Sequence, residues 1–237
     1  MKQVSGPFEL PSMGGELLSP GHHVPFKIMD TYIKHFPVEY HAQTAVEAAL
    51  ALRSDLIHAE GPNALSQVQD VEIGSYDIAI EIIGRDPEKW CPSTRETADH
   101  SFPYCVAVAL LKGRMTLNAF SPRLLQDPEL RGFMKKIRVV ARPELKDRYP
   151  QEMPTVLTVR TATGKEYRQE IALPLGHPGN PMSDRHLEEK FRAMAGNRLS
   201  HARMNQIIAL VWQLERVKDT GSLMSLMKVK NRDVKIA

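Results

Sequence analysis

A lysine and a histidine lie seven residues apart around a proline, where an extended segment is predicted to meet a helix. Lys34 follows the run of residues 26–33, which is expected to be extended, and Pro37 stops that run. His41 stands where an alanine-rich helix begins. Ionisable groups at such a corner are typical of a binding site. The alternatives are a solvated lysine at a strand end and a histidine that holds the corner.

A histidine and a tyrosine are predicted to share one face of a later helix. His100 and Tyr104 are four residues apart on a helix that a capping box at Ser93 would open. The imidazole is suited to proton transfer, and the phenol could donate to a substrate oxygen. Pro103 would instead start the helix near Ser101, which leaves His100 on the preceding loop. Tyr104 could equally be a core aromatic with a satisfied hydroxyl.

Other reactive side chains favour structural roles. His22 and His23 are adjacent in a Gly/Pro-rich loop, where a solvated pair is expected. Cys91 and Cys105 have no metal-type spacing and are expected to be free thiols in a reducing compartment. His177 lies in a glycine–proline loop and is expected to be structural. We therefore expect no metal site.

The composition is typical of a soluble globular protein. The 237 residues are 42% hydrophobic and 25% charged, with a net charge of +3. We expect no nucleic-acid partner, because Lys and Arg do not cluster and aromatics do not interleave with them. We also expect no membrane partner, because no apolar run is long enough to span one. The chain is expected to be cytoplasmic.

The order of predicted elements indicates an α+β fold rather than repeated βαβ units. Strands are expected at residues 24–34, 68–73 and 137–140, with a hairpin of residues 156–161 and 165–173. Helices are expected at residues 42–59, 76–83, 93–111 and 121–136, followed by three C-terminal helices.

Three motifs, taken in order, resemble the MmgE/PrpD family. They are KHFPVEYHAQTAVEAA at residues 34–49, DHSFPYCVAVALL at residues 99–111 and GHPGNPMS at residues 176–183. The resemblance runs over nearly the whole chain. It implies an α+β lid domain at residues 24–176, a loop-rich leader at residues 1–23, and a C-terminal helical segment at residues 177–237. These helices would pack on an all-helical domain that is missing here, so we expect the chain to be the C-terminal half of such a protein.

The resemblance also implies a chemistry and a set of site residues. Family dehydratases remove water from a tricarboxylate without a metal or redox cofactor, as in propionate catabolism. The matching positions make Lys34, Tyr104 and His100 the catalytic candidates, and His41 a substrate-binding candidate. The family's remaining catalytic groups, an aspartate and histidines, belong to the helical domain. The expected partner is therefore a helical N-terminal-half polypeptide or, in a homo-oligomer, further copies of the chain.

Three readings of function remain open from the sequence. The wording of residues 37–43 favours a 2-methylcitrate dehydratase-like lyase. A cis-aconitate decarboxylase-like lyase, or another lyase or isomerase of the same superfamily, is a second reading, because fold similarity does not fix a substrate. A catalytically silent remnant or assembly module, which folds and pairs without turnover, is the third.

Overall fold

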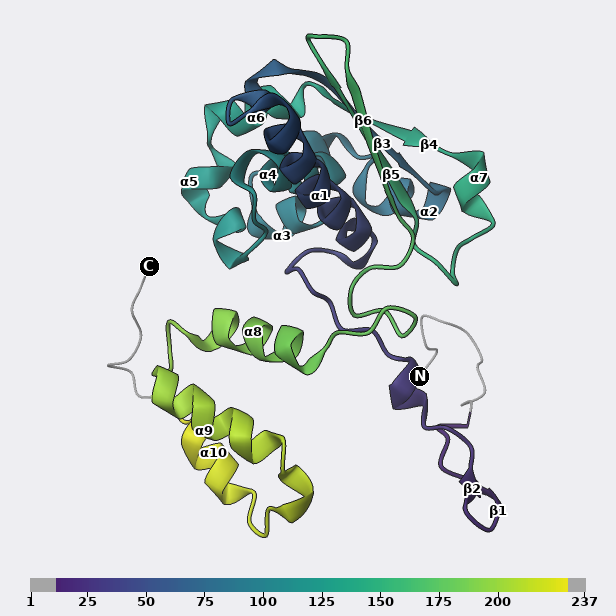
Figure 1. Cartoon of the computed structure of the whole chain (residues 1–237), viewed down its shortest axis with the longest axis vertical. Helices are drawn as coiled ribbons and strands as arrows, with labels where there is room; N and C mark the ends of the chain where they lie inside the picture. The colour runs from purple at the N-terminus through teal and green to yellow at the C-terminus, as the bar shows by residue number, and fades with distance from the viewer. Residues whose placement is uncertain (1–11, 230–237) are drawn as a thin grey trace, which may run out of the picture. The chain divides into compact units, whose positions relative to one another are not determined.

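A four-stranded mixed sheet organises the first part of the chain in the computed structural model, which describes residues 12–229 (Figure 1). The strand order is β4-β3-β5-β6. The strands are β3 (Val68–Ser75), β4 (Ile137–Ala141), β5 (Thr155–Thr161) and β6 (Glu166–Ile171). β3 pairs with β4 in parallel, and the other two pairs are antiparallel. The long connection from β3 to β4 carries most of the helices of this unit, as a parallel pair requires.

The α-helices, the 3₁₀-helices and a small hairpin complete the described structure. The α-helices are α1 (Gln43–Glu60), α2 (Asp77–Ile83), α3 (Arg95–Asp99), α4 (Phe102–Lys112), α5 (Pro122–Leu125), α6 (Pro128–Met134), α7 (Pro143–Lys146), α8 (Asp184–Ala195), α9 (His201–Val211) and α10 (Gly221–Met227). The 3₁₀-helices are η1 (Lys27–Asp30), η2 (Tyr40–Ala42), η3 (Ala64–Gln67), η4 (Pro87–Trp90), η5 (Leu117–Phe120) and η6 (Leu214–Arg216). The hairpin pairs β1 (Leu17–Ser19) with β2 (His22–His23).

The chain divides into two compact units, one ending at Pro181 and the other beginning at Met182. The second unit contains α8, α9 and α10, so the three predicted C-terminal helices are confirmed. Part of the predicted leader, residues 1–11, lies outside the described residues. The division into a leader at residues 1–23, a lid at residues 24–176 and a helical segment at residues 177–237 stays a prediction.

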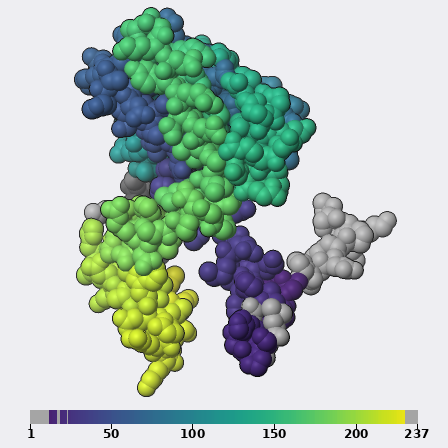
Figure 2. Space-filling view, turned by 45° about the vertical axis from the view of Figure 1, so that its right-hand side comes forward, coloured from purple at the N-terminus to yellow at the C-terminus, as the bar shows by residue number. Residues whose placement is uncertain are grey.

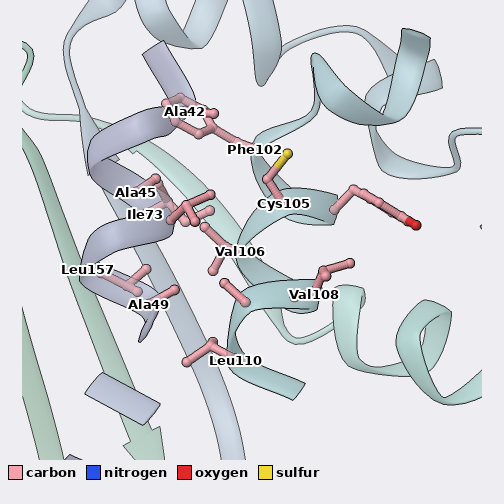
Figure 3. Close-up of a cluster of buried hydrophobic side chains, with 14 of the residues drawn as sticks. Ala42, Ala45, Ala49, Ile73, Phe102, Cys105, Val106, Val108, Leu110 and Leu157 are labelled. Atoms are coloured by element: carbon pink, nitrogen blue, oxygen red, sulfur yellow. The ribbon is translucent and has the colours of Figure 1, made fainter. Parts of the chain in front are cut away.

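The core of the first unit lies between the sheet and two helices. α1 lies against β5, β6 and α4. Ala45 and Ala49 of α1 lie close to Ile73 and Leu157 of the sheet, and Val106 and Leu110 of α4 lie beside them (Figure 3). All of these side chains are buried. The small alanine side chains let the α1 backbone approach its neighbours closely, and α1 thereby becomes a fixed base for the segment that precedes it.

The other face of the sheet carries paired charges. Glu72 accepts hydrogen bonds from Arg138 and Arg142, and Arg138 also binds Asp70. Arg160 joins the same network through Asp70 at 2.9 Å. The β5–β6 hairpin, green in Figure 2, forms part of the surface of the first unit in that view. Asp70, Arg138 and Arg160 are partly exposed on this face, whereas Glu72, which binds two arginines, is buried.

Five sequence predictions of single elements are confirmed. They are the helix at residues 42–59, the strand at 68–73, the helix at 76–83, the strand at 137–140 and the hairpin after residue 155. The two cysteines are free, as expected, and Cys105 is buried. Together the sheet and helices form the predicted α+β fold.

The predicted strand at residues 24–34 is wrong. The chain forms η1 there, and the Thr31 hydroxyl donates to the Ile28 carbonyl at 2.7 Å. Ile28 and Met29 are exposed, so the apolar pattern does not mark a buried strand. The segment has no ladder partner among the described strands, and its backbone reaches the rest of the fold through the Ile33 amide, which donates to the Gly176 carbonyl at 3.0 Å.

Two predicted helices are each divided by a proline. The helix expected at residues 93–111 is α3 followed by α4, and the cap of α3 is Thr94 rather than Ser93. Ser101 caps α4 by accepting from the Tyr104 amide at 3.1 Å, and Pro103 fits at the helix start, where its missing N–H costs nothing. Pro128 divides the helix expected at residues 121–136 in the same way, into α5 and α6.

Candidate functional site

Gln43 fixes the loop that carries the first two candidate residues. Its side-chain nitrogen donates to the carbonyls of Phe36 at 2.9 Å and Val38 at 3.2 Å. Its side-chain oxygen accepts from the Phe36 amide at 3.0 Å. Gln43 is completely buried at the start of α1. The rigid helix therefore holds the turn between Lys34 and His41 in one conformation.

His41 belongs to a buried cluster of polar aromatic side chains. Its Nδ1 atom is hydrogen-bonded to the hydroxyl of Tyr76, which directly follows β3. The Tyr76 ring stacks on Tyr149, with ring centroids 4.8 Å apart. The Glu39 carboxylate accepts from the His41 backbone amide at 2.7 Å and caps η2. His41 is thus held from both sides, by its own turn and by the end of the central strand.

The electrostatics of this cluster favour a neutral imidazole and a neutral phenol. Burial lowers the pKa of His41, the Glu39 carboxylate opposes this effect, and the Lys34 ammonium lowers that pKa further. Burial is also the main cause that raises the pKa of Tyr76, with smaller contributions from Tyr149 and Glu39. Near neutral pH, His41 is therefore an uncharged proton acceptor or donor, and Tyr76 keeps its proton.

Lys34 lies at the exposed side of the same corner. Its side chain is exposed, whereas His41 has only 8% of its surface exposed. The positive charge of Lys34 is close enough to His41 to affect the pKa of the imidazole. An exposed cation beside a buried neutral imidazole can receive a carboxylate from solvent and hold the attached carbon skeleton near the ring. Lys34 and His41 thus belong to the same turn before α1, and the binding site that they would form stays a prediction.

His100 reaches this corner through its neighbour Asp99. The His100 ring is the C-cap of α3, where its Nδ1 atom pairs with the Asp99 carboxylate and lies 3.1 Å from the Glu96 carbonyl. The Asp99 carbonyl accepts from the Glu39 amide at 2.8 Å, so the end of α3 adjoins the loop of His41. The prediction that His100 and Tyr104 share one helix face is wrong, because the chain turns between α3 and α4.

Tyr104 packs in the core. Only 1% of its surface is exposed, and its hydroxyl donates to the Ala119 carbonyl at 2.5 Å. Its ring lies 6.1 Å from that of Phe120, and burial raises the pKa of the phenol. This hydroxyl is already satisfied by backbone. The contacts of Tyr104 therefore favour the packing role that the sequence left as the alternative, and its catalytic role stays a prediction.

Several residues of the cluster were not among the sequence candidates. Glu39 lies inside the first motif, but glutamate is not one of the preferred N-cap residues, so its capping of η2 had no sequence signal. Tyr76 follows the end of the central strand, a common place for functional side chains, and could have been found from that position. Tyr149 has no local signal, because its contact with Tyr76 joins segments 73 residues apart in the sequence.

The described residues offer no evident metal centre or membrane span. Between residues 12 and 229, no group of three or more His, Cys, Asp and Glu side chains is placed to hold a metal ion. Within the same range, no helix combines the length and the apolar character that crossing a bilayer requires.

The sequence of residues 36–214 matches the MmgE/PrpD C-terminal domain. The chain belongs to the MmgE/PrpD family. It is 31% identical over 184 residues to a 2-methylcitrate dehydratase of Cupriavidus necator, covering 73% of this chain and 36% of the relative. It is 26% identical over 203 residues to a cis-aconitate decarboxylase of Mus musculus, covering 84% of this chain and 40% of the relative. The chain therefore spans less than half the length of these relatives.

Proposed function

We propose that this chain is the C-terminal half of a 2-methylcitrate dehydratase-like lyase, which removes water from a tricarboxylate. The observation that carries the proposal is the buried pair of His41 and Tyr76, inside the sequence region that matches the family, with the exposed Lys34 two residues before that region. The similarity to dehydratases supports the reaction class.

The cluster could supply part of what a dehydration needs. In this elimination, a base takes a proton from carbon, the neighbouring C–O bond breaks, and the hydroxyl leaves as water after an acid protonates it. Lys34 would anchor a substrate carboxylate. His41, neutral and held by Tyr76, would contact the substrate and orient it. His100, half-exposed at the end of α3, is the candidate for proton transfer from the other side of the loop. Positioned acid or base groups are worth about a hundred- to ten-thousand-fold in rate.

The remaining groups would come from a helical partner. We propose that the carbon base lies on a helical polypeptide that pairs with this chain, or on another copy in a homo-oligomer. The short coverage of the relatives supports this part of the proposal, because 60% or more of each compared relative lies outside the aligned region. The C-terminal helices would provide a surface for that partner.

A cis-aconitate decarboxylase-like activity is the second candidate. The mouse decarboxylase aligns with 84% of this chain, compared with 73% for the Cupriavidus necator dehydratase, although at lower identity. Both names describe enzymes of tricarboxylate-type compounds. Lys34 would anchor a carboxylate in either reaction, so the products formed must distinguish the two.

The experiment is a reconstitution with a matched pair of variants. The chain is assayed with 2-methylcitrate and with cis-aconitate, alone and together with the helical N-terminal part of a related dehydratase. We expect dehydration of 2-methylcitrate only in the mixture. Lys34→Met should lower kcat/KM by about a hundredfold or more, as expected for loss of a charge-stabilising contact in an active site. Lys27→Met removes a nearby exposed lysine and should leave kcat/KM unchanged.

Three results would contradict parts of the proposal. Turnover by the purified chain alone at an ordinary enzymatic rate would refute the need for a partner. Carbon dioxide release from cis-aconitate without dehydration of 2-methylcitrate would favour the decarboxylase-like reading. A stable complex with the helical part that is inactive on both compounds would favour a silent assembly module.

A further inference from the structure

The loop at residues 175–180 contacts the segment that carries Lys34. The Gly176 carbonyl accepts from the Ile33 amide at 3.0 Å, one residue before Lys34. On its other side, the loop is tied to α1, because the Leu175 amide donates to the Glu47 carboxylate at 2.7 Å. A chain of contacts therefore runs from α1 through this loop to the residue next to Lys34.

An aromatic stack reinforces the same contact. The Tyr32 ring lies 4.7 Å from the His177 ring and 4.9 Å from the Tyr40 ring, centroid to centroid. The interplanar angles are 24° and 15°, so both pairs are stacked. Tyr32 thus joins the loop of His177 to the turn that leads into His41.

The His177 ring is held in one orientation. Its Nδ1 atom accepts from the Gly179 amide at 2.9 Å, so the ring hydrogen of the neutral form is on Nε2. The residue is 9% exposed, and Nε2 has no hydrogen-bond partner among the described residues. The ring is therefore fixed by its backbone contact and by stacking. Burial of its Nε2–H group without a partner costs free energy of folding.

The backbone of the loop is also closed on itself. The Gly176 amide donates to the Asn180 carbonyl, and the Asn180 amide donates to the His177 carbonyl, both at 2.8 Å. Gly176 has a φ of 97°, a left-handed conformation that a residue with a Cβ atom would adopt only with strain. The loop is thus a stiff platform rather than a flexible connection.

We propose that His177 is a positioning residue, which holds residues 32–34 so that the Lys34 ammonium stays beside His41. The need for such a device follows from the local structure. Residues 24–34 pair with no strand of the described sheet, and the lysine side chain is long and flexible. The hydrogen bond at Ile33 and the stack on Tyr32 restrain the two residues before Lys34. The inference rests on the proposed function in taking Lys34 as the carboxylate anchor.

The test measures separately how firmly residues 32–34 are held and how well the chain binds a tricarboxylate. Amide hydrogen exchange of Ile33 is followed by NMR in the full chain, and citrate binding is followed by calorimetry as the tricarboxylate probe. The variants are His177→Ala, which removes the stacked ring, and His177→Phe, which keeps a stacking ring. Tyr32→Leu breaks the same stack from the more exposed side, in case His177→Ala does not fold. His58→Ala removes an exposed histidine of α1 as the control.

We expect His177→Ala and Tyr32→Leu to speed the exchange of Ile33 at least tenfold and to weaken citrate binding in parallel with Lys34→Met. His177→Phe should restore most of both values. Unchanged Ile33 exchange in His177→Ala and Tyr32→Leu would overturn the proposed grip, whatever the chain does as an enzyme. Faster exchange with citrate binding intact, while Lys34→Met still weakens it, would overturn positioning alone. If Lys34→Met has no effect, or the wild type binds no citrate, the proposed anchor fails, and Ile33 exchange alone decides whether His177 holds the segment.

Discussion

The side-chain amide of Gln43 closes a pair of hydrogen bonds on the backbone of Phe36, seven residues earlier. It accepts from the Phe36 amide at 3.0 Å and donates to the Phe36 carbonyl at 2.9 Å. The Gln43 side chain thus pairs with the backbone N–H and C=O of Phe36, as the backbone of a neighbouring strand would. It therefore sets the path of the chain between Lys34 and His41, and the candidate site depends on it.

Gln43→Ala should destabilise the protein strongly. It leaves the Phe36 amide and two carbonyls buried without partners, and each such group costs about 1–3 kcal/mol. Even at the lower figure for all three groups, we expect a total loss of about 3 kcal/mol, which lowers Tm by roughly 6–12 °C for a chain of this size. Gln43→Glu keeps the acceptor but removes the donor, and it should also be destabilising. Gln206→Ala, at an exposed helical glutamine, is the control. Equal melting temperatures for the two alanine variants would show that the Gln43 bonds contribute little.

Tyr104→Phe distinguishes a packing role from a catalytic one. The change removes the hydroxyl that donates to the Ala119 carbonyl and keeps the ring. We expect a loss of about 1 kcal/mol, seen as a Tm lower by about 2–4 °C, because one buried hydrogen bond is removed. In the reconstituted enzyme, kcat/KM should stay within a fewfold of the wild type. A hundredfold loss of kcat/KM at an unchanged Tm would instead return Tyr104 to the catalytic group.

The sequence predicted the elements whose pattern is local. Short stretches of sequence encode the helical spacing of Leu52 and Leu56, the alternation along β5 and β6, and the turn between these strands. The structure contains all three. The placement of Lys34 and His41 on one turn before α1 was also predictable, because both belong to one motif. Whether this turn binds an anion stays a prediction.

Other features depend on contacts that a local pattern does not encode. Residues 26–33 have the β-branched and aromatic residues of a strand, but Ile28 and Met29 are exposed, so the pattern gave no information about a sheet. The partner of the Tyr104 hydroxyl, the Ala119 carbonyl, depends on how η5 follows α4. Tyr149 joins the cluster through a contact that no local pattern encodes.

The second unit should promote self-association of the isolated chain. Among its described residues, two apolar side chains are buried, Met204 and Ile207. More apolar side chains remain exposed on it, namely Met194, Val211, Trp212, Leu214, Met224, Met227 and Val229. Contiguous exposed apolar surface is typical of an interaction site or an aggregation liability. Sedimentation velocity should show association that grows with protein concentration.

Charged substitutions test whether that surface is responsible. Val211→Lys combined with Met224→Lys should reduce the association, because a lysine resists desolvation. Leu117→Lys combined with Met29→Lys places the same two charges on exposed apolar residues of the first unit and should not reduce it. A monomer across a wide concentration range for the wild type would contradict the prediction.

The stability of the protein should fall when the pH is lowered through the range in which His41 is protonated. Burial lowers the pKa of folded His41 below the ordinary histidine value of 6.5. The Glu39 carboxylate opposes this shift, and the Lys34 charge adds to it. The unfolded chain therefore binds the proton first, so the free energy of unfolding decreases as the pH falls below about 6.5. One titrating histidine contributes a slope of at most about 1.4 kcal/mol per pH unit.

His41→Gln should make that decrease shallower, because glutamine can still bond the Tyr76 hydroxyl but takes up no proton. The measurement is the free energy of unfolding by urea at several pH values between neutral pH and about 5.

Burial lowers the pKa of His177 as well, so His177→Gln should also make the decrease shallower. The carboxyl of Glu47, whose pKa burial raises, acts in the opposite direction on acidification, so the comparison is made between each variant and the wild type. His58→Gln controls for the loss of an exposed histidine. If His41→Gln follows the wild-type pH dependence, His41 is not buried in its neutral form, and the proposed arrangement with Tyr76 is wrong.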